Sequence, residues 1–256
     1  MSPGAPSLTP QPAARVLTAL LDLLFPPRCV GCGRSGVWLC ASCQAAVPRL
    51  EPPLCPRCGE PLSPGGRCPR GGQHPLRLEG LRSAAWYDGP LRVAIHHHKY
   101  RGLRALTGPL AAILAEAWRR APPPVDLLVP VPLHPRRVRE RGFNQAALLA
   151  RHLSRETGLR LDERSLCRAR YTAPQVSLSA PERRANVEGA FVCQGTALAG
   201  RRVCLIDDLC TTGATLEACA AALRQAGAGA VWAFTLARPR WDPVGRSKGE
   251  GEPDSL

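Results

Sequence analysis

The sequence has no long apolar run. Its longest near-continuous apolar stretch, around residues 16–25, is interrupted by Thr18 and Asp22 and is far shorter than the ~20 residues of a membrane-spanning helix. Arg15 precedes this stretch, but no small-residue cleavage site follows it, which argues against a signal peptide. We therefore expect a cytoplasmic protein with no membrane span.

Lysine is nearly absent. Of the 34 basic residues, only Lys99 and Lys248 are lysines, and the rest are arginines. This preference, together with 27 prolines, fits GC-rich codons as well as it fits a function. The formal net charge is +14, and residues 1–78 carry eight arginines against three acidic residues. Such a basic region would attract phosphate backbones, with a solvated arginine-rich surface as the alternative.

A disulfide framework is not indicated, although the chain has 12 cysteines. Seven of them fall between residues 29 and 68 in CxxC-type spacings, which favour metal binding in a reducing compartment. Two CxxC pairs come first, and four thiolates at this spacing suit tetrahedral Zn²⁺. The predicted ligands of this first cluster are Cys29, Cys32, Cys40 and Cys43.

A second set of cysteines is incomplete. Cys55, Cys58 and Cys68 repeat the pattern, but Gly71 occupies the place of the fourth cysteine. His74 is the candidate fourth ligand, at an unusual spacing, and loss of this second zinc site is the alternative.

Composition divides the chain into a small metal-dependent part and one larger domain, because residues 28–78 have too few large apolar residues to bury a core without an ion. Beyond them, strand-like and helical stretches alternate, which predicts an α/β fold with a mostly parallel sheet flanked by helices. The expected parts are a disordered tail at 1–12, a short helix at 13–27, a zinc-ribbon module at 28–78, the α/β domain at 79–241 and a flexible tail at 242–256. The expected strands lie at 83–87, 127–130, 203–206 and 231–236, and the expected helices at 91–100, 103–119, 143–156 and 213–226.

One strand, turn and helix carry the strongest functional signal, in the string VCLIDDLCTTGATL at 203–216. A buried strand is predicted to end at Asp207 and Asp208, and a turn of small residues leads into a helix. The helix start offers unpaired N–H groups at the positive end of its dipole, which suit a phosphate. The two carboxylates accept hydrogen bonds from a vicinal diol such as that of ribose, with Mg²⁺ nearby. The predicted phosphate-binding residues are Thr211, Thr212, Gly213, Ala214 and Thr215.

This string resembles the phosphoribosyl pyrophosphate signature of type I phosphoribosyltransferases. The resemblance implies that the chain binds phosphoribosyl pyrophosphate with Mg²⁺, and that the domain at 79–241 has a type I phosphoribosyltransferase-like fold. In that fold, Asp207 and Asp208 would be the catalytic pair that holds the ribose.

Three further strings resemble ComF-type proteins, a family whose founding members act in natural competence for DNA uptake. They are DLLVPVPLHPRRVRERGFNQAALLARHL at 126–153, RYTAPQVSLSAPERRANVEGAF at 170–191 and HHHKYRGLRAL at 96–106. Residues 171–188 resemble the mobile segment that covers the site in this superfamily. Together with the CxxC pairs, the resemblance implies a zinc ribbon joined to a phosphoribosyltransferase domain and a role in transformation.

A basic side of the site is expected opposite the acidic pair. The extended turn at 129–132 has free amides that can meet a pyrophosphate, and the guanidinium groups after it suit multidentate phosphate contacts. Lys99 is a compact ammonium in a chain that otherwise uses arginine, which suggests a specific need. A solvated face for the arginines and a random surface position for the lysine are the alternatives. The candidate pyrophosphate-binding residues are Lys99, Val131, Arg137 and Arg141.

Three consecutive histidines, at 96–98, invite a metal interpretation. Consecutive positions on a helix point in different directions, which predicts a partly exposed patch instead.

Two functions fit these residues. The first is displacement of pyrophosphate from the anomeric carbon of the ribose, in which the protein positions the ligand and stabilises charge, although no base for the acceptor is evident. The second is a non-catalytic competence adaptor that binds single-stranded DNA through the basic zinc module and contacts a helicase or a recombination mediator, partners that the family resemblance implies. Nucleobase salvage fits less well, because no base-recognition element is evident and salvage needs no zinc ribbon.

Overall fold

The computed structural model describes residues 26–71, 74, 77–172 and 180–240. The predicted tails at 1–12 and 242–256, and all but the last two residues of the helix predicted at 13–27, lie outside the described residues. Residues 26 and 27 are not helical. In these ranges, no helix is both long enough and apolar enough to cross a membrane.

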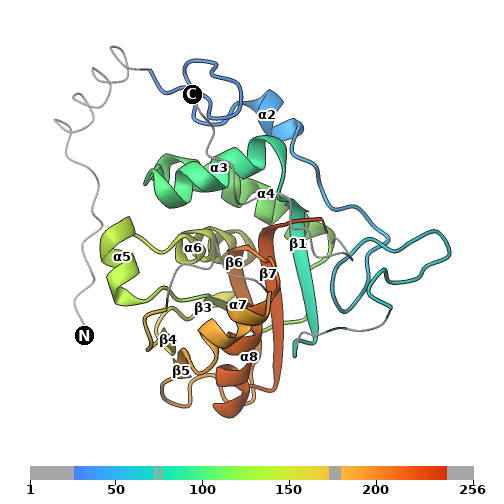
Figure 1. The fold of residues 1–256 in the computed structure, drawn as a ribbon, viewed down its shortest axis with the longest axis vertical. Helices are drawn as coiled ribbons and strands as arrows, with labels where there is room; N and C mark the ends of the chain where they lie inside the picture. The colour runs from blue at the N-terminus through green and yellow to red at the C-terminus, as the bar shows by residue number, and fades with distance from the viewer. Residues whose placement is uncertain (1–25, 72–73, 75–76, 173–179, 241–256) are drawn as a thin grey trace.

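The centre of the fold is a five-stranded sheet in which every neighbouring pair of strands is parallel. Parallel neighbours need crossover connections, and helices supply them (Figure 1). The arrangement confirms the predicted α/β fold with a mostly parallel sheet flanked by helices. The strand order is β1 (Gly80–Trp86), β7 (Ala230–Arg238), β6 (Arg202–Leu209), β2 (Leu127–Pro130) and β3 (Arg160–Leu161).

Helices cover both faces of the sheet. The side chains of each strand alternate between the two faces, so one strand contributes apolar side chains to the core on each side. On β6, Cys204 and Ile206 belong to one core cluster, whereas Val203 and Leu205 belong to the other. The first cluster includes residues of α3 (Gly89–Tyr100), α4 (Thr107–Arg120) and α6 (Gln145–Thr157). The second cluster includes residues of α7 (Ala180–Val187) and α8 (Ala214–Gln225). It also includes residues of the antiparallel pair β4 (Leu166–Arg168) and β5 (Phe191–Cys193). Shorter elements are α2 (Ala41–Ala45), η1 (Arg104–Leu106) and α5 (Pro135–Arg141).

The strands and helices predicted for the domain are present, with shifted ends, and one shift concerns the acidic pair. β6 continues through Asp207 and Asp208 to Leu209, so the prediction that this strand ends at residue 206 is wrong. The reason is β7, because Asp207 and Leu209 pair in register with Thr235 and Ala237. The acidic pair is therefore held by sheet hydrogen bonding rather than by a loop.

The zinc-ribbon module packs on the outer strand of the sheet. β1 has one sheet neighbour, and its other side meets the module: the N–H of Trp86 donates to the carbonyl oxygen of Pro48 (2.9 Å), and that of Leu81 donates to the carbonyl oxygen of Arg57 (2.8 Å). The module also contributes to the core cluster of α3 and α4, through Leu39, Cys40, Cys43 and Val47. The module and the domain thus share one core.

Candidate functional site

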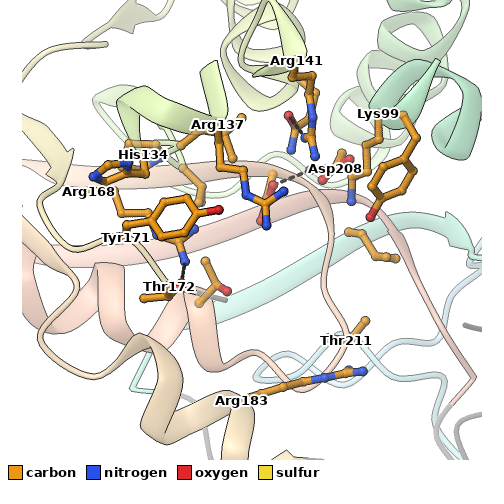
Figure 2. A pocket seen from close by; sticks show the side chains of 18 residues that line it. Lys99, His134, Arg137, Arg141, Arg168, Tyr171, Thr172, Arg183, Asp208 and Thr211 are labelled. Carbon is orange, nitrogen blue, oxygen red and sulfur yellow. Dashed lines mark hydrogen bonds and ion pairs between the residues drawn. The ribbon is translucent and has the colours of Figure 1, made fainter. Parts of the chain in front are cut away.

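A cavity of about 290 Å³ opens at the carboxyl ends of β2 and β6 (Figure 2). Open α/β sheets usually bind ligands at this edge. The lining consists of Lys99, Tyr100, Val131, Pro132, Leu133, His134, Arg137, Arg141, Gln145, Arg168, Tyr171, Thr172, Arg183, Asp207, Asp208, Leu209, Thr211 and Thr215. Most of the residues that the sequence nominates for the ligand are therefore brought together by the fold.

The turn at residues 210–213, which we call the phosphate turn, leads from β6 into α8. Gly213 is the N-cap of the helix and has a φ of 83°, a left-handed conformation that favours glycine. The N–H of Ala214 donates to the hydroxyl oxygen of Thr212 (3.3 Å). Of the predicted phosphate-binding residues, Thr211 and Thr215 line the cavity, while Thr212, Gly213 and Ala214 shape the turn and the helix start.

The acidic pair lies at the base of the cavity. Asp207 and Asp208 are only 8% and 3% exposed. The N–H of Asp208 donates to Oδ1 of Asp207 (2.8 Å), and the ammonium of Lys99 lies 2.9 Å from Oδ2 of Asp208. Lys99 reaches this position from the last turn of α3, so the lysine that the sequence singles out is the ion-pair partner of the acidic pair.

The two carboxyl groups differ in their pKa values. Burial raises the pKa of Asp207 well above its ordinary value, and the neighbouring charge of Asp208 raises it further. Burial also acts to raise the pKa of Asp208, but the ammonium of Lys99, the hydrogen bond with Asp207 and the charge of Arg141 together lower that pKa. The pKa of Lys99 is raised, because its attraction to Asp208 and Asp207 exceeds the effect of burial. Asp208 is thus the carboxylate, and Asp207 is the group that resists ionisation.

A basic wall faces the acidic pair from α5. Arg137 and Arg141 line the cavity, whereas Arg136 is turned outward and pairs with Glu140. The amide group of Asn144 donates to the carbonyl oxygen of Val131 (3.0 Å), which fixes the turn after β2. The two arginines that we predicted as pyrophosphate ligands are therefore among those that reach the cavity.

Several cavity residues escape the sequence prediction. Arg168 extends from β4, stacks on the ring of Phe191 at 5.3 Å and donates to the hydroxyl of Thr172. Arg183, from α7, lies on the same side of the cavity as Thr211, across from Arg137 and Arg141 (Figure 2). The string at 170–191 was the available signal, but it gives no indication of which side chains face the ligand. The part of the predicted covering segment at 173–179 lies outside the described residues.

The histidine patch is only partly as predicted. His96 is exposed and His97 is half-buried, but His98 is 1% exposed and its Nε2 lies 2.9 Å from the hydroxyl of Thr107. Burial lowers the pKa of His98 to about 4, so the ring is neutral at pH 7. The prediction of exposure is wrong for His98, because it lies seven residues after buried Leu91 on the inner face of α3.

The first metal cluster has the geometry of a zinc site. Its four sulfur atoms lie within 4.8 Å of one another, and those of Cys32 and Cys40 are 3.7 Å apart. Sulfur atoms in a tetrahedral site with Zn–S bonds of about 2.3 Å lie roughly 3.8 Å apart, so the cluster fits the ion. Burial acts to raise the pKa of Cys29, but N–H groups such as that of Cys40 outweigh it and lower the pKa to about 6, which favours a thiolate.

The second metal cluster is also complete, with His74 in the fourth position. The sulfur atoms of Cys58 and Cys68 are 3.6 Å apart, and Nε2 of His74 lies 3.9 Å from the sulfur of Cys55. All four ligand atoms lie within 4.8 Å of one another. The structure therefore gathers the predicted set of three cysteines and one histidine, and this set fits a second structural zinc ion.

Known proteins resemble this chain over most of its length. Residues 20–71 match the family described as Double zinc ribbon domain. The chain is 35% identical over 213 residues to the DNA utilization protein YhgH of Escherichia coli O157:H7, a match that covers 79% of this chain and 92% of that protein. It is 32% identical over 231 residues to Competence protein F of Haemophilus influenzae, which covers 84% of this chain and 98% of that protein. Among solved structures it is similar to a purine phosphoribosyltransferase from Pyrococcus horikoshii Ot3, with 16% identity and a TM-score of 0.32 over 52% of this chain and 82% of that one.

Proposed function

This chain belongs to the ComF family, and we propose that it binds phosphoribosyl pyrophosphate with Mg²⁺ in the cavity and acts in the uptake or use of DNA. The parallel sheet and the match at residues 20–71 confirm the α/β domain with its small zinc-ribbon module, and family membership supports the type I phosphoribosyltransferase-like form of that domain. The observation that carries the ligand proposal is that a buried acidic pair, a helix start and a basic wall enclose one cavity. The names of the two relatives support the DNA part of the proposal.

Each part of the ligand has a matching part of the cavity. The 5-phosphate suits the phosphate turn, because α8 begins there and Thr211 and Thr215 line the cavity. The ribose hydroxyls suit the carboxyl groups of Asp207 and Asp208. The pyrophosphate suits the basic side, and the residues that would hold it are Lys99, Val131, Arg137 and Arg141.

The acidic pair also fits a magnesium ion. Mg²⁺ prefers carboxylate oxygens and substrate phosphates as ligands, and the two aspartates supply buried oxygen atoms beside the cavity. Bound there with the ligand, the ion would neutralise charge on the pyrophosphate.

In the enzymatic form of the proposal, pyrophosphate is displaced by an acceptor. The bond between the anomeric carbon and a pyrophosphate oxygen breaks, and its electron pair leaves with the pyrophosphate. A nucleophilic atom of the acceptor bonds to that carbon and loses its proton, which the departing pyrophosphate takes up. Arg137, Arg141 and Lys99 would stabilise the departing charge. The acidic pair would hold the ribose hydroxyls while positive charge builds up on the ring.

Calorimetric titration of phosphoribosyl pyrophosphate with Mg²⁺ tests this proposal. We expect binding by the parent, and a loss of at least ~1.4 kcal/mol, about tenfold in Kd, in Asp208→Asn. Asp126→Asn is the matched control, because Asp126 pairs with Arg202 at the amino ends of β2 and β6, away from the cavity. Absence of binding heat with the parent, or equal affinity in Asp208→Asn, contradicts the proposal. Pyrophosphate release, screened against bases, nucleotides and single-stranded DNA, then decides whether bound ligand turns over.

A second candidate, single-stranded DNA binding without catalysis, is favoured by the mouth of the cavity. Tyr100 and Tyr171 both line it and are 56% and 38% exposed. Arg141 lies 5.6 Å from the ring centre of Tyr100, and Arg136 lies 4.7 Å from that of Tyr171. Exposed aromatic rings beside guanidinium groups are the elements with which proteins stack unpaired bases.

The zinc-ribbon module is a less suitable DNA contact than its charge predicts. Two of its arginines already face acids, because Arg49 pairs with Glu116 and Arg70 lies 3.5 Å from Glu60. We therefore place the contact at the cavity mouth rather than on the module.

Fluorescence anisotropy with a labelled thymidine oligonucleotide tests whether the cavity mouth or the zinc-ribbon module contacts the DNA. We expect Tyr100→Ala and Tyr171→Ala each to weaken binding by ~1–3 kcal/mol, the contribution of one stacked base. Val192→Ala on β5, which removes an exposed apolar side chain outside the cavity, should leave the affinity unchanged. Unchanged affinity in both tyrosine variants would exclude the cavity mouth as the DNA contact.

A further inference from the structure

The second metal cluster lies against the carboxyl end of β7 through a buried carboxylate. The N–H of Cys55 donates to the carbonyl oxygen of Glu60 (2.7 Å), so the turn that carries Cys55 and Cys58 closes at Glu60. The Glu60 side chain is 2% exposed. A carboxylate so fully removed from water needs charged partners.

Arg238, the last residue of β7, supplies the main partner. Its side chain is also 2% exposed, and its guanidinium donates both to the carbonyl oxygen of Cys58 and to the carboxylate of Glu60. This guanidinium bridges the backbone of one metal ligand and the carboxylate two residues later. It therefore fixes the second cluster to the end of one strand.

The phosphate turn is fixed to the adjacent residue of that strand. Leu209 pairs with Ala237, and the N–H of Cys210 donates to the carbonyl oxygen of Ala237 (3.0 Å). Burial raises the pKa of the Cys210 thiol to about 11, and the nearby cation of Arg238 acts against this rise. Consecutive residues of β7 thus hold the phosphate turn and the second cluster.

A second guanidinium also contacts the Glu60 carboxylate. Oε1 of Glu60 also lies 3.5 Å from Nη2 of Arg70, so two guanidinium groups share one carboxylate. Both arginines therefore help to hold the Glu60 carboxylate in place.

We propose that the second metal cluster holds the phosphate turn in its binding conformation, with Glu60 and Arg238 as the positioning residues that connect them. The effect on affinity rests on the proposed function, whereas the effect on the order of the turn does not. The zinc-ribbon module is, in this view, part of the support of the ligand site.

Arg238→Met and Arg238→Lys test the connection together. Methionine keeps much of the length without the charge, while lysine keeps the charge but cannot donate to both partners in the same planar geometry. For Arg238→Met we expect zinc content equal to that of the parent, faster hydrogen exchange at residues 210–215, and Kd for phosphoribosyl pyrophosphate raised about tenfold or more. For Arg238→Lys we expect a partial recovery of both exchange protection and affinity.

Glu116→Gln is the matched control, because it removes a different ion pair between the zinc-ribbon module and the domain, Arg49 with Glu116, which ends on α4. We expect no change in exchange at residues 210–215. Glu60→Gln attacks the connection from the module side and is the substitute should Arg238→Met not fold.

Unchanged exchange at residues 210–215 in folded variants of Arg238 and Glu60, or the same acceleration in Glu116→Gln, overturns the connection. Should the parent bind no phosphoribosyl pyrophosphate, the proposed function fails, and the exchange measurement still decides whether the second cluster orders the turn.

Discussion

Two regions of the molecule bury charge, and they balance it differently. Where the zinc-ribbon module meets β7, Glu60 and Arg238 are each 2% exposed and neutralise each other directly. In the cavity, Asp207 and Asp208 are adjacent, and Lys99 pairs with Asp208. The contact at β7 holds two parts of the fold together, whereas the cavity keeps a carboxyl group whose ionisation burial disfavours. If the cavity binds the ligand that we propose, the buried acidic pair gives up stability for binding, whereas the contact at β7 adds stability.

The largest expected effect on stability comes from removing a metal ligand of the zinc-ribbon module. Cys43→Ser should lower the free energy of unfolding by about 4 kcal/mol or more, because it removes a thiolate from a metal cluster that belongs to the core cluster of α3 and α4. Urea unfolding combined with zinc analysis measures this loss. Cys167→Ser, on β4 and outside both clusters, is the control and should change stability little. Equal stability of the two variants would contradict the view that the zinc-ribbon module stabilises the fold.

The next effect has the opposite sign and concerns the cavity. Asp207→Asn should raise the free energy of unfolding at pH 7 by about 1 kcal/mol, because it removes a buried ionisable group while its amide oxygen can still accept from the N–H of Asp208. The same variant should bind phosphoribosyl pyrophosphate less tightly. Urea unfolding and calorimetry, run on one preparation, check both. A destabilised Asp207→Asn would contradict our description of the cavity.

The gain from Asp207→Asn should also depend on pH. The pKa of Asp207 is raised in the folded protein, first by burial and then by Asp208, so ionisation costs the parent stability at pH values above that raised pKa. The cost fades as the pH falls through the folded pKa and vanishes below the unfolded value of about 3.9. Unfolding curves from pH 7 down to about pH 4 should therefore converge for parent and variant. A gain that stays constant over this range would rule out the charge as its cause.

The smallest effect is expected at the ion pair between Arg49 of the module and Glu116 of α4. Arg49 and Glu116 are 17% and 36% exposed, and solvent screens such a pair. Glu116→Gln should therefore lower the free energy of unfolding by less than about 1 kcal/mol. Thermal unfolding measures this difference. A larger loss would mean that the module is held as much by its half-exposed charges as by its buried ones.

Local patterns in the sequence are sufficient to predict the acidic pair and the turn that follows it. The string around Asp207 and Asp208 combines an apolar run, two acids and small residues within fourteen positions, and neighbours in sequence remain neighbours in the fold. The metal ligands follow the same logic, including His74, whose position depends on a spacing of six residues after Cys68. The end of β6 could not be predicted, because it depends on pairing with Thr235 and Ala237 of a strand that comes later in the chain.

The other half of the site is assembled by tertiary structure. Arg168 comes from a three-residue strand, and such a strand is too short to have a detectable alternation of apolar residues. α5 is seven residues long and has no buried residue, so it lacks the apolar stripe that reveals a helix. The exception is His98, because its spacing from Leu91 and Ile95 places it on the apolar face of α3 and could have predicted its burial.

The backbone bonds between the zinc-ribbon module and β1 have a consequence for self-association. β1 is seven residues long, and without the module its outer side would present a row of free N–H and C=O groups, which is a template for adding a strand from another molecule. Metal supply would then decide whether the sheet ends within one chain or continues into the next. A preparation stripped of zinc is therefore expected to aggregate through this edge, and its scattering in solution should rise before its helices unfold.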